Sequence, residues 1–228
     1  MTTARQCLIF FDLDGCIVDS TIPIRTCLDA AFAENALPPI PPDGLNRHVG
    51  PPLQVTLAEV VAENGREPEL VEVLIAAYRS RYVDMSVELA AAYPGVAELV
   101  VGLVERGARV GVVTSKPQRF AVPILEALGL DRHLEVIVGP DLTEDESKVA
   151  TLARAIGLVA PLDQPASLMI GDRHHDIDAA IAHDMSGIGV LWGFGSRAEL
   201  EGAGAVAVAE TAADLALVLG AVVYEGRS

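Results

Sequence analysis

The chain has 228 residues, a mass of 24.0 kDa and a formal net charge of -16 at pH 7. This length allows one domain with an insert or a large and a small domain, and the charge disfavours nucleic acids and anionic membranes as partners, because both bind basic surfaces. No signal peptide and no apolar run of about 18 residues is present, so we predict a cytoplasmic protein without a transmembrane helix.

Short apolar runs along the chain predict β-strands, and helical patterns separate most of them. The predicted strands are 7–11, 108–114, 134–139, 167–171, 187–191 and 205–209. The predicted helices between and after them are 95–106, 118–129, 147–157, 175–184 and 211–220. Short, fully apolar strands that alternate with helices favour an α/β fold with a parallel sheet covered on both faces.

Residues 19–93 interrupt this alternation. Their pattern predicts three helices and no strand, near 21–36, 53–64 and 69–84. The stretch "LPPIPPDGLNRHVGPPL" at 37–53 is rich in Pro and Gly and cannot be one continuous helix or a central strand. We therefore predict a core made of residues 1–18 and 94–228, with a helical insert at 19–93.

Two aspartates follow the first apolar run, in "CLIFFDLDGCIVDS". In an extended chain residues i and i+2 point to the same side, so Asp12 and Asp14 predict two carboxylates that face one site. Gly15 then permits a tight turn. The alternative is an ordinary turn whose aspartates cap backbone amides. An EF-hand loop fits poorly, because Pro23 stands where that loop needs a glutamate.

Two further segments place polar groups where they could contact a phosphate. In "VVTSKP", Thr114 ends a strand and is followed by Ser115 and Lys116, and a hydroxyl with nearby backbone N–H groups can hold phosphate oxygens. An ordinary helix N-cap is the alternative there. Lys148 follows the acidic run "TEDES" and is either a surface lysine or a cation for the same site.

The segment "MIGDRHHDIDAA" ends another strand with a charged group. Asp172 follows the strand, and Asp176 lies four residues on, at a spacing that can share a helical face. The alternative is a helix N-terminus, where negative charge is favourable. We interpret His174 and His175 as loop or surface residues, because adjacent side chains are expected to face different ways and His183 is not at ligand spacing.

Because ligands bind at the carboxyl ends of parallel strands, we expect Asp12, Asp14, Asp172 and Asp176 to converge. Four carboxylates repel one another unless a cation compensates them, and Mg²⁺ is the usual cation where a phosphate also binds. Lys148 would offset the remaining negative charge. Asp12 could then act as a nucleophile and Asp14 as an acid and base in phosphoryl transfer.

In chain order, "FDLDGCIVDS", "VVTSKP", Lys148 and "GDRHHD" resemble the four motifs of the haloacid dehalogenase superfamily of phosphatases. "GPPL" (50–53), "TSKPQRFAVPILEALGL" (114–130) and "GVLWGFGSRAELEGAGA" (189–205) resemble its phosphoglycolate phosphatase and bacterial 5′-nucleotidase branch in particular. The resemblance covers nearly the whole chain. It implies a Rossmann-like core, with the 19–93 insert as a helical cap.

The resemblance also implies a Mg²⁺-dependent phosphatase with a role for each matched residue. Asp12 would be the nucleophile and a metal ligand, and Asp14 the general acid and base with its backbone carbonyl on the metal. Thr114 would bind the phosphoryl group, Lys148 would pair with Asp12 and phosphate, and Asp172 would complete the metal site.

The remaining predicted site residues have supporting roles. Asp176 would support the metal through water or hydrogen bonds, and Gly15 and Ser115 would contact the substrate. Arg47, in the insert, could bind a carboxylate or second phosphate with its fork of donors. A solvated arginine in a loop is the alternative for Arg47.

We predict hydrolysis of a small phosphorylated metabolite, such as phosphoglycolate or a 5′-nucleotide. The alternatives are a sugar phosphomutase or pyrophosphatase on the same core, or a non-catalytic phosphate-binding or receiver-like protein. Cys16 stands where relatives usually have Thr, and a thiol is a weaker hydrogen-bonding group. The presence of Asp14 disfavours dehalogenation, and the absence of lysine from 19–93 disfavours phosphonate cleavage.

Overall fold

The structure is a computed structural model that describes residues 7–41, 44–45, 53–141 and 146–225. The chain forms two compact units. The core unit comprises Met1–Asp19 and Ala92–Ser228, and the helical unit comprises Ser20–Ala91. That the helical unit acts as a cap stays a prediction.

The core unit contains a parallel sheet of six strands in the order β3-β2-β1-β4-β5-β6. The strands are β1 (Leu8–Phe11), β2 (Arg109–Val113), β3 (Val136–Val138), β4 (Leu168–Gly171), β5 (Ser186–Val190) and β6 (Ala207–Ala209). All four side chains of β1 are buried, as expected for a central strand whose two faces are both covered. The predicted α/β fold class is confirmed.

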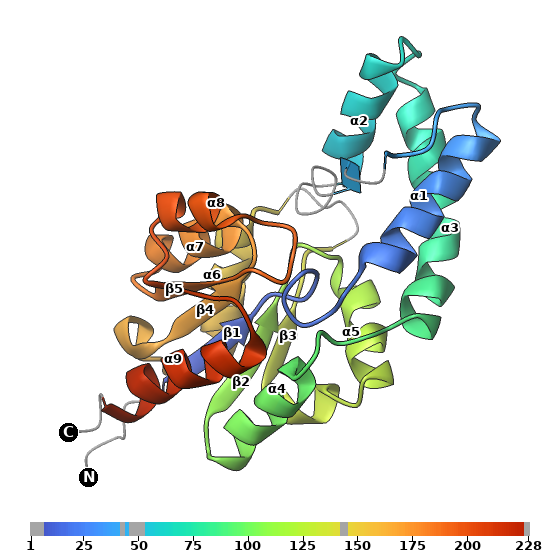
Figure 1. Ribbon diagram of the computed structural model, residues 1–228. Helices are drawn as coiled ribbons and strands as arrows, with labels where there is room; N and C mark the ends of the chain where they lie inside the picture. Colours follow the sequence, from blue (N-terminus) through green and yellow to red (C-terminus); the bar gives the residue numbers. More distant parts are fainter. Residues whose placement is uncertain (1–6, 42–43, 46–52, 142–145, 226–228) are drawn as a thin grey trace. The chain divides into compact units, whose positions relative to one another are not determined.

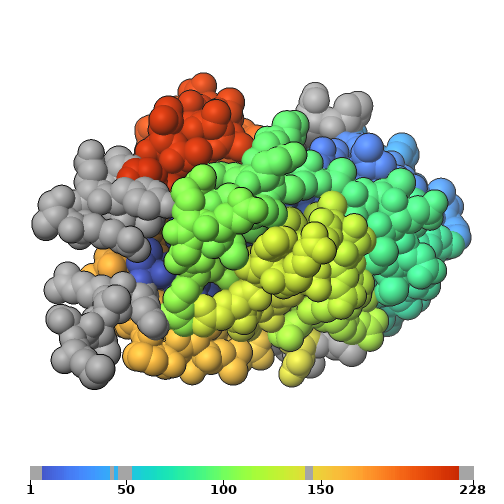
Figure 2. All heavy atoms as spheres, turned by 90° about the horizontal axis from the view of Figure 1, so that it is seen from below, coloured from blue at the N-terminus to red at the C-terminus, as the bar shows by residue number. Residues whose placement is uncertain are grey.

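Within the described residues, six helices surround this sheet: α4 (Val96–Glu105), α5 (Gln118–Ala127), α6 (Lys148–Val159), α7 (His174–Ala182), α8 (Arg197–Ala203) and α9 (Ala212–Glu225). Figure 1 shows α4, α5 and α9 on one face of the sheet and α6, α7 and α8 on the other. In the space-filling view of Figure 2 the red atoms of α9 lie against the green atoms of α4. This arrangement follows from right-handed crossovers, since the strand order runs outward from β1 in both directions.

Helix α8 is absent from the sequence prediction, which placed no helix between 191 and 205. The Ser196 side chain caps it by accepting a hydrogen bond from the Glu199 amide at 3.2 Å. Gly204 ends it in the left-handed conformation. The sequence "SRAE" carries the Ser-x-x-Glu pattern that often starts a helix, so a signal for α8 was present.

The helical unit consists of α1 (Thr21–Glu34), α2 (Leu53–Glu63) and α3 (Leu70–Glu88). α3 packs against both α1 and α2. Tyr78 and Tyr82 on α3 are buried and stack with their ring centroids 4.9 Å apart, so both belong to the interior of this unit. Arg47 and "GPPL" lie outside the described residues.

Ser167 ties the start of β1 to the start of β4. Its fully buried hydroxyl accepts a hydrogen bond from the Leu8 amide at 3.2 Å and donates one to the Asp163 carbonyl at 2.7 Å. β1 and β4 are neighbours in the sheet, so this hydroxyl satisfies a backbone donor at the point where their pairing begins.

No helix among the described residues has the length and apolar character needed to cross a membrane.

We predict that Ser167→Ala lowers the free energy of unfolding by about 1–3 kcal/mol, because it leaves the buried Leu8 amide without its side-chain acceptor. Urea denaturation followed by circular dichroism measures this change. Ser80→Ala on exposed α3 surface is the control, with an expected change within about 0.5 kcal/mol. Equal stability of the two variants would contradict the prediction.

Candidate active site

The carboxyl ends of three adjacent strands bring the predicted site residues together. β1 lies between β2 and β4, and the residues that follow these strands are Asp12, Thr114 and Asp172. The Asp12 amide donates to the Ile170 carbonyl at 2.8 Å, which extends the pairing of β1 with β4 as far as the first aspartate. The sheet therefore fixes the backbone from which these side chains project.

Three of the four predicted carboxylates form one group. Asp12, Asp172 and Asp176 each offer an oxygen, and these oxygens lie within 4.8 Å of one another. All three residues are buried. Asp12 and Asp172 come from the strand ends, whereas Asp176 comes from the first turn of α7. We call these three residues the aspartate group.

Lys148 supplies positive charge to this group. Its Nζ lies 2.6 Å from Asp12 Oδ1 and 2.9 Å from Asp176 Oδ1, and the side chain is almost fully buried. Burial alone would lower the pKa of Lys148, but the two carboxylates outweigh it and raise the pKa, so the lysine stays charged. Lys148 is the first residue of α6, whose N-terminus is capped by Ser147.

One lysine does not compensate three buried carboxylates. Burial raises the pKa of Asp12 to about 7, and repulsion from Asp176 adds to this while Lys148 opposes it. Burial also raises the pKa of Asp172 well above its usual value, together with repulsion from Asp176 and Asp12. Without a further cation, the group therefore favours bound protons.

The aspartate group has the properties of a site for a hard divalent cation. Asp172 Oδ1 is fully buried and has no hydrogen-bond donor within the part of the chain that the structure describes. Such an oxygen is costly unless a cation or proton meets it. The donors are all carboxylate oxygens, the ligand type that Mg²⁺ and Ca²⁺ prefer.

Asp14 lies apart from the aspartate group. Its Oδ1 forms an ion pair with Lys116 Nζ at 2.9 Å, and the lysine is largely buried. Lys116 belongs to "VVTSKP", but no role was predicted for it from the sequence. Its position directly after Thr114 and Ser115, at the end of a strand where ligands bind, was the signal that could have predicted a role for Lys116.

Thr114 and Ser115 lie beside this ion pair. Thr114 is buried, and its Oγ1 accepts a hydrogen bond from the Lys116 amide at 3.1 Å. Ser115 is half-buried. The turn after β2 therefore carries two hydroxyl residues and the buried lysine that pairs with Asp14.

The loop after β5, residues 191–196, packs directly on the site. The Phe194 amide donates to Asp172 Oδ2 at 2.7 Å, and Trp192 Nε1 donates to the Cys16 carbonyl at 2.9 Å. Gly15 adopts a φ of 81°, and a Cβ there would overlap the Asp172 carboxylate. From the sequence, this segment contributed only to the family resemblance, and its contact with Asp172 was not predicted.

Cys16 is fully buried, and burial raises the pKa of its thiol. Its Sγ donates to the Ile170 carbonyl at 3.5 Å. The thiol at this position is therefore neutral and hydrogen-bonded to the backbone of β4.

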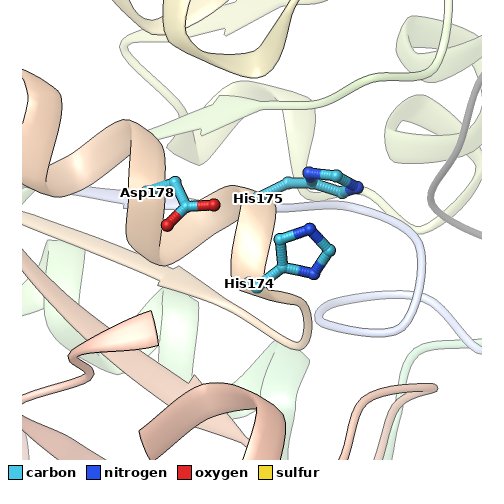
Figure 3. A group of neighbouring side chains, drawn as sticks. All are labelled: His174, His175 and Asp178. Atoms are coloured by element: carbon cyan, nitrogen blue, oxygen red, sulfur yellow. The ribbon is translucent and has the colours of Figure 1, made fainter. Parts of the chain in front are cut away.

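The interpretation of His174 and His175 was wrong in its geometry. Their ring centroids lie 3.8 Å apart, so the two rings lie side by side, as Figure 3 shows. α7 begins at His174 rather than 175, and the two rings lie together although their residues are adjacent on the helix. His174 Nδ1 also lies 2.9 Å from Glu199 Oε1, which belongs to the unpredicted helix α8.

The model of one family, described as haloacid dehalogenase-like hydrolase, matches residues 9–190. The chain belongs to this family. The match confirms the predicted family, and it spans β1 to β5, including every residue of the aspartate group.

Curated relatives within this family carry different names. The chain is 35% identical over 190 residues to tyrosine-protein kinase PtkA of Mycobacterium tuberculosis, covering 82% of this chain and 63% of PtkA. It is 34% identical to a 5′-nucleotidase of Pseudomonas aeruginosa, covering 84% and 86% of the two chains, and 27% identical to phosphoglycolate phosphatase 1 of that organism, covering 82% and 70%. The chain thus spans less than two thirds of the length of PtkA.

Solved structures of family members share the fold. A predicted phosphatase from Clostridium acetobutylicum superposes with a TM-score of 0.84 at 28% identity, covering 95% of this chain and 99% of the other. The structure of M. tuberculosis PtkA superposes with a TM-score of 0.81 at 32% identity, covering 96% of this chain and 100% of the solved chain.

We predict that the metal-free protein loses stability as the pH rises from about 4 to 7. The pKa of Asp12 is 3.8 in its ordinary state and about 7 here, so in this window the native state binds more protons than the unfolded state. Urea midpoints in EDTA at pH 5 and pH 7.5 measure the decline. The fall in the urea midpoint should be smaller in Asp12→Asn than in the wild type. Equal falls in the two proteins would contradict the attribution of this pH dependence to Asp12.

We also predict that Gly193→Ala destabilises the protein by roughly 1–3 kcal/mol, because the new Cβ would overlap the Gly15 carbonyl and the Asp172 carboxylate. Gly202→Ala on α8 is the matched control, since among the described residues no atom other than those of its chain neighbours and the nearby α8 backbone lies within 4 Å of its new Cβ. That substitution should leave stability unchanged or raise it by up to about 1 kcal/mol. Chemical denaturation compares the two, and a neutral Gly193→Ala would contradict the close packing of this loop.

Proposed function

We propose that the chain is a Mg²⁺-dependent phosphatase that hydrolyses a small phosphate monoester of the phosphoglycolate or 5′-nucleotide class. One observation carries the proposal: a buried Asp12 carboxylate lies 2.6 Å from Lys148 within a group of three carboxylates. The names of two relatives, a 5′-nucleotidase and a phosphoglycolate phosphatase, support the substrate class.

Asp12 is the proposed nucleophile. Its carboxylate oxygen attacks phosphorus and forms an aspartyl phosphate, while the bond from phosphorus to the ester oxygen breaks. Lys148 keeps the carboxylate oriented through its ion pair and offers a positive charge to a phosphoryl oxygen. Mg²⁺ held by Asp12, Asp172 and Asp176 would add charge stabilisation of the phosphoryl group.

Asp14 is the proposed acid and base. It donates a proton to the leaving ester oxygen and later accepts one from the water that attacks the aspartyl phosphate, which releases inorganic phosphate and restores Asp12. Lys116 holds the Asp14 carboxylate in place. Thr114, Ser115 and the backbone at Gly15 are the proposed contacts of the phosphoryl group.

We further propose that the helical unit is a cap that selects the substrate. Arg47 is the candidate residue for binding a second anionic group of that substrate. The proposal follows the position of this unit in the sequence, between the first two strands of the core.

The similarity to tyrosine-protein kinase PtkA supports a second candidate function. At 35% identity it favours transfer of a phosphoryl group from a nucleoside triphosphate to a tyrosine hydroxyl. Hydrolysis and this transfer differ in the acceptor, which is water in one case and a phenolic oxygen in the other.

We expect the purified protein to release phosphate from phosphoglycolate or a 5′-nucleotide with Mg²⁺ and not with EDTA. Asp12→Asn should reduce turnover by more than about a thousand-fold, because it removes the nucleophile. Asp131→Asn is the matched control and should keep wild-type activity. Asp131 lies in the short 3₁₀ helix Asp131–His133 and is not one of the proposed site residues.

The same protein, incubated with γ-labelled ATP and a tyrosine-containing peptide, separates the two candidates. Label on the peptide supports the kinase, whereas phosphate release from the monoester with no label on the peptide supports the phosphatase. Phosphate release that survives in Asp12→Asn, or that continues in EDTA, would contradict the proposed mechanism.

A further inference from the structure

A second set of potential metal ligands lies at the start of α7, distinct from the aspartate group. His174, His175 and Asp178 each offer one ligand atom, and these atoms lie within 4.8 Å of one another. Figure 3 shows the two rings next to each other and the Asp178 carboxylate, one turn further along α7, with one oxygen turned toward them. No part of the proposed phosphatase mechanism uses these three side chains.

The orientation of His174 is set by α8. Glu199 Oε1 accepts hydrogen bonds from Arg173 Nε at 2.8 Å and from the His174 amide at 3.0 Å, and it lies 2.9 Å from His174 Nδ1. A carboxylate paired with arginine accepts and does not donate, so His174 Nδ1 carries the hydrogen in this contact. The neutral imidazole then has its lone pair on Nε2.

This arrangement is typical of histidines that bind metals. A ligating histidine usually donates its other ring N–H to a carboxylate, which fixes the tautomer and the ring orientation. Glu199 has this position relative to His174. The observation is independent of the clustering of the three ligand atoms, because Glu199 comes from a different helix and lies on the opposite ring nitrogen.

The chemistry of the donors differs from that of the aspartate group. Two imidazoles and one carboxylate suit a borderline transition metal such as Zn²⁺, Ni²⁺ or Cu²⁺, whereas three carboxylates suit a hard ion. Zn–N bonds of about 2.0–2.1 Å require ligand atoms within roughly 4.2 Å of one another. Asp178 is exposed and can rotate to close the difference.

We propose that His174, His175 and Asp178 form a binding site for a divalent transition-metal ion, separate from the aspartate group. The site has three protein ligands and is open to solvent, so water completes the coordination and the ion exchanges freely. The His174 side chain is 39% exposed, which leaves an entry path.

The first test is equilibrium dialysis of the full chain against Zn²⁺ in millimolar Mg²⁺, which occupies the aspartate group. We expect one Zn²⁺ per chain in the wild type. His174→Ala and His175→Ala should each weaken Zn²⁺ binding at least about tenfold. Glu199→Gln should weaken it by about 10–100-fold, because the carboxylate that orients His174 is lost. His183→Ala and His133→Ala are the matched controls and should bind as the wild type does.

The second test is the visible absorption of the protein with Co²⁺ in place of Zn²⁺, since its bands report the ligands directly. We expect bands that disappear in His174→Ala and persist in Asp172→Asn. Circular dichroism of each variant checks that it is folded. The proposal is overturned if the wild type binds no Zn²⁺ under these conditions, if His174→Ala and His175→Ala bind it unchanged, or if Asp172→Asn abolishes the Co²⁺ bands.

Discussion

The burial of three carboxylates at one edge of the sheet is the constraint on which the rest of the site depends. Asp12, Asp172 and Asp176 have oxygens within 4.8 Å of one another, and only Lys148 among the described residues forms an ion pair with them there. Charges taken out of water at this density are unfavourable unless compensated. The folded chain therefore keeps excess negative charge that a divalent cation could compensate. The free energy of unfolding is then expected to depend on the binding of metal ions and protons.

Two backbone hydrogen bonds and one glycine fix the positions of Asp12 and Asp172. The Phe194 amide holds Asp172, the Asp12 amide is tied to β4, and Gly15 leaves room for the Asp172 side chain. Each interaction joins segments that are far apart in the sequence. The site is therefore built on rigid elements of the sheet and one close-packed loop, which limits how far any of the three oxygens can move.

The core unit holds three kinds of polar chemistry, contributed by segments that are far apart in the sequence. The aspartate group offers oxygen ligands, the Asp14–Lys116 pair offers a carboxylate outside that group, and the first turn of α7 offers imidazoles. The proposed function assigns the cation to the first of these and the acid and base to the second. The shared fold of relatives named as phosphatase, nucleotidase and kinase agrees with a core whose chemistry is common and whose acceptor varies.

The sequence by itself determined the parallel sheet, the family and the strand-end places of Asp12, Thr114 and Asp172, whereas the family resemblance assigned Lys148 to the site. Short apolar runs define buried strands, and parallel strands must bring their carboxyl ends to one edge, so local pattern is sufficient. Tertiary structure alone decided that Asp14 pairs with Lys116 and that the Phe194 amide holds Asp172, because such contacts depend on side-chain and loop packing between segments about 100 and 20 residues apart. The neighbouring rings of His174 and His175 belong to the same class, since side-chain packing sets their directions and Glu199 from α8 orients His174.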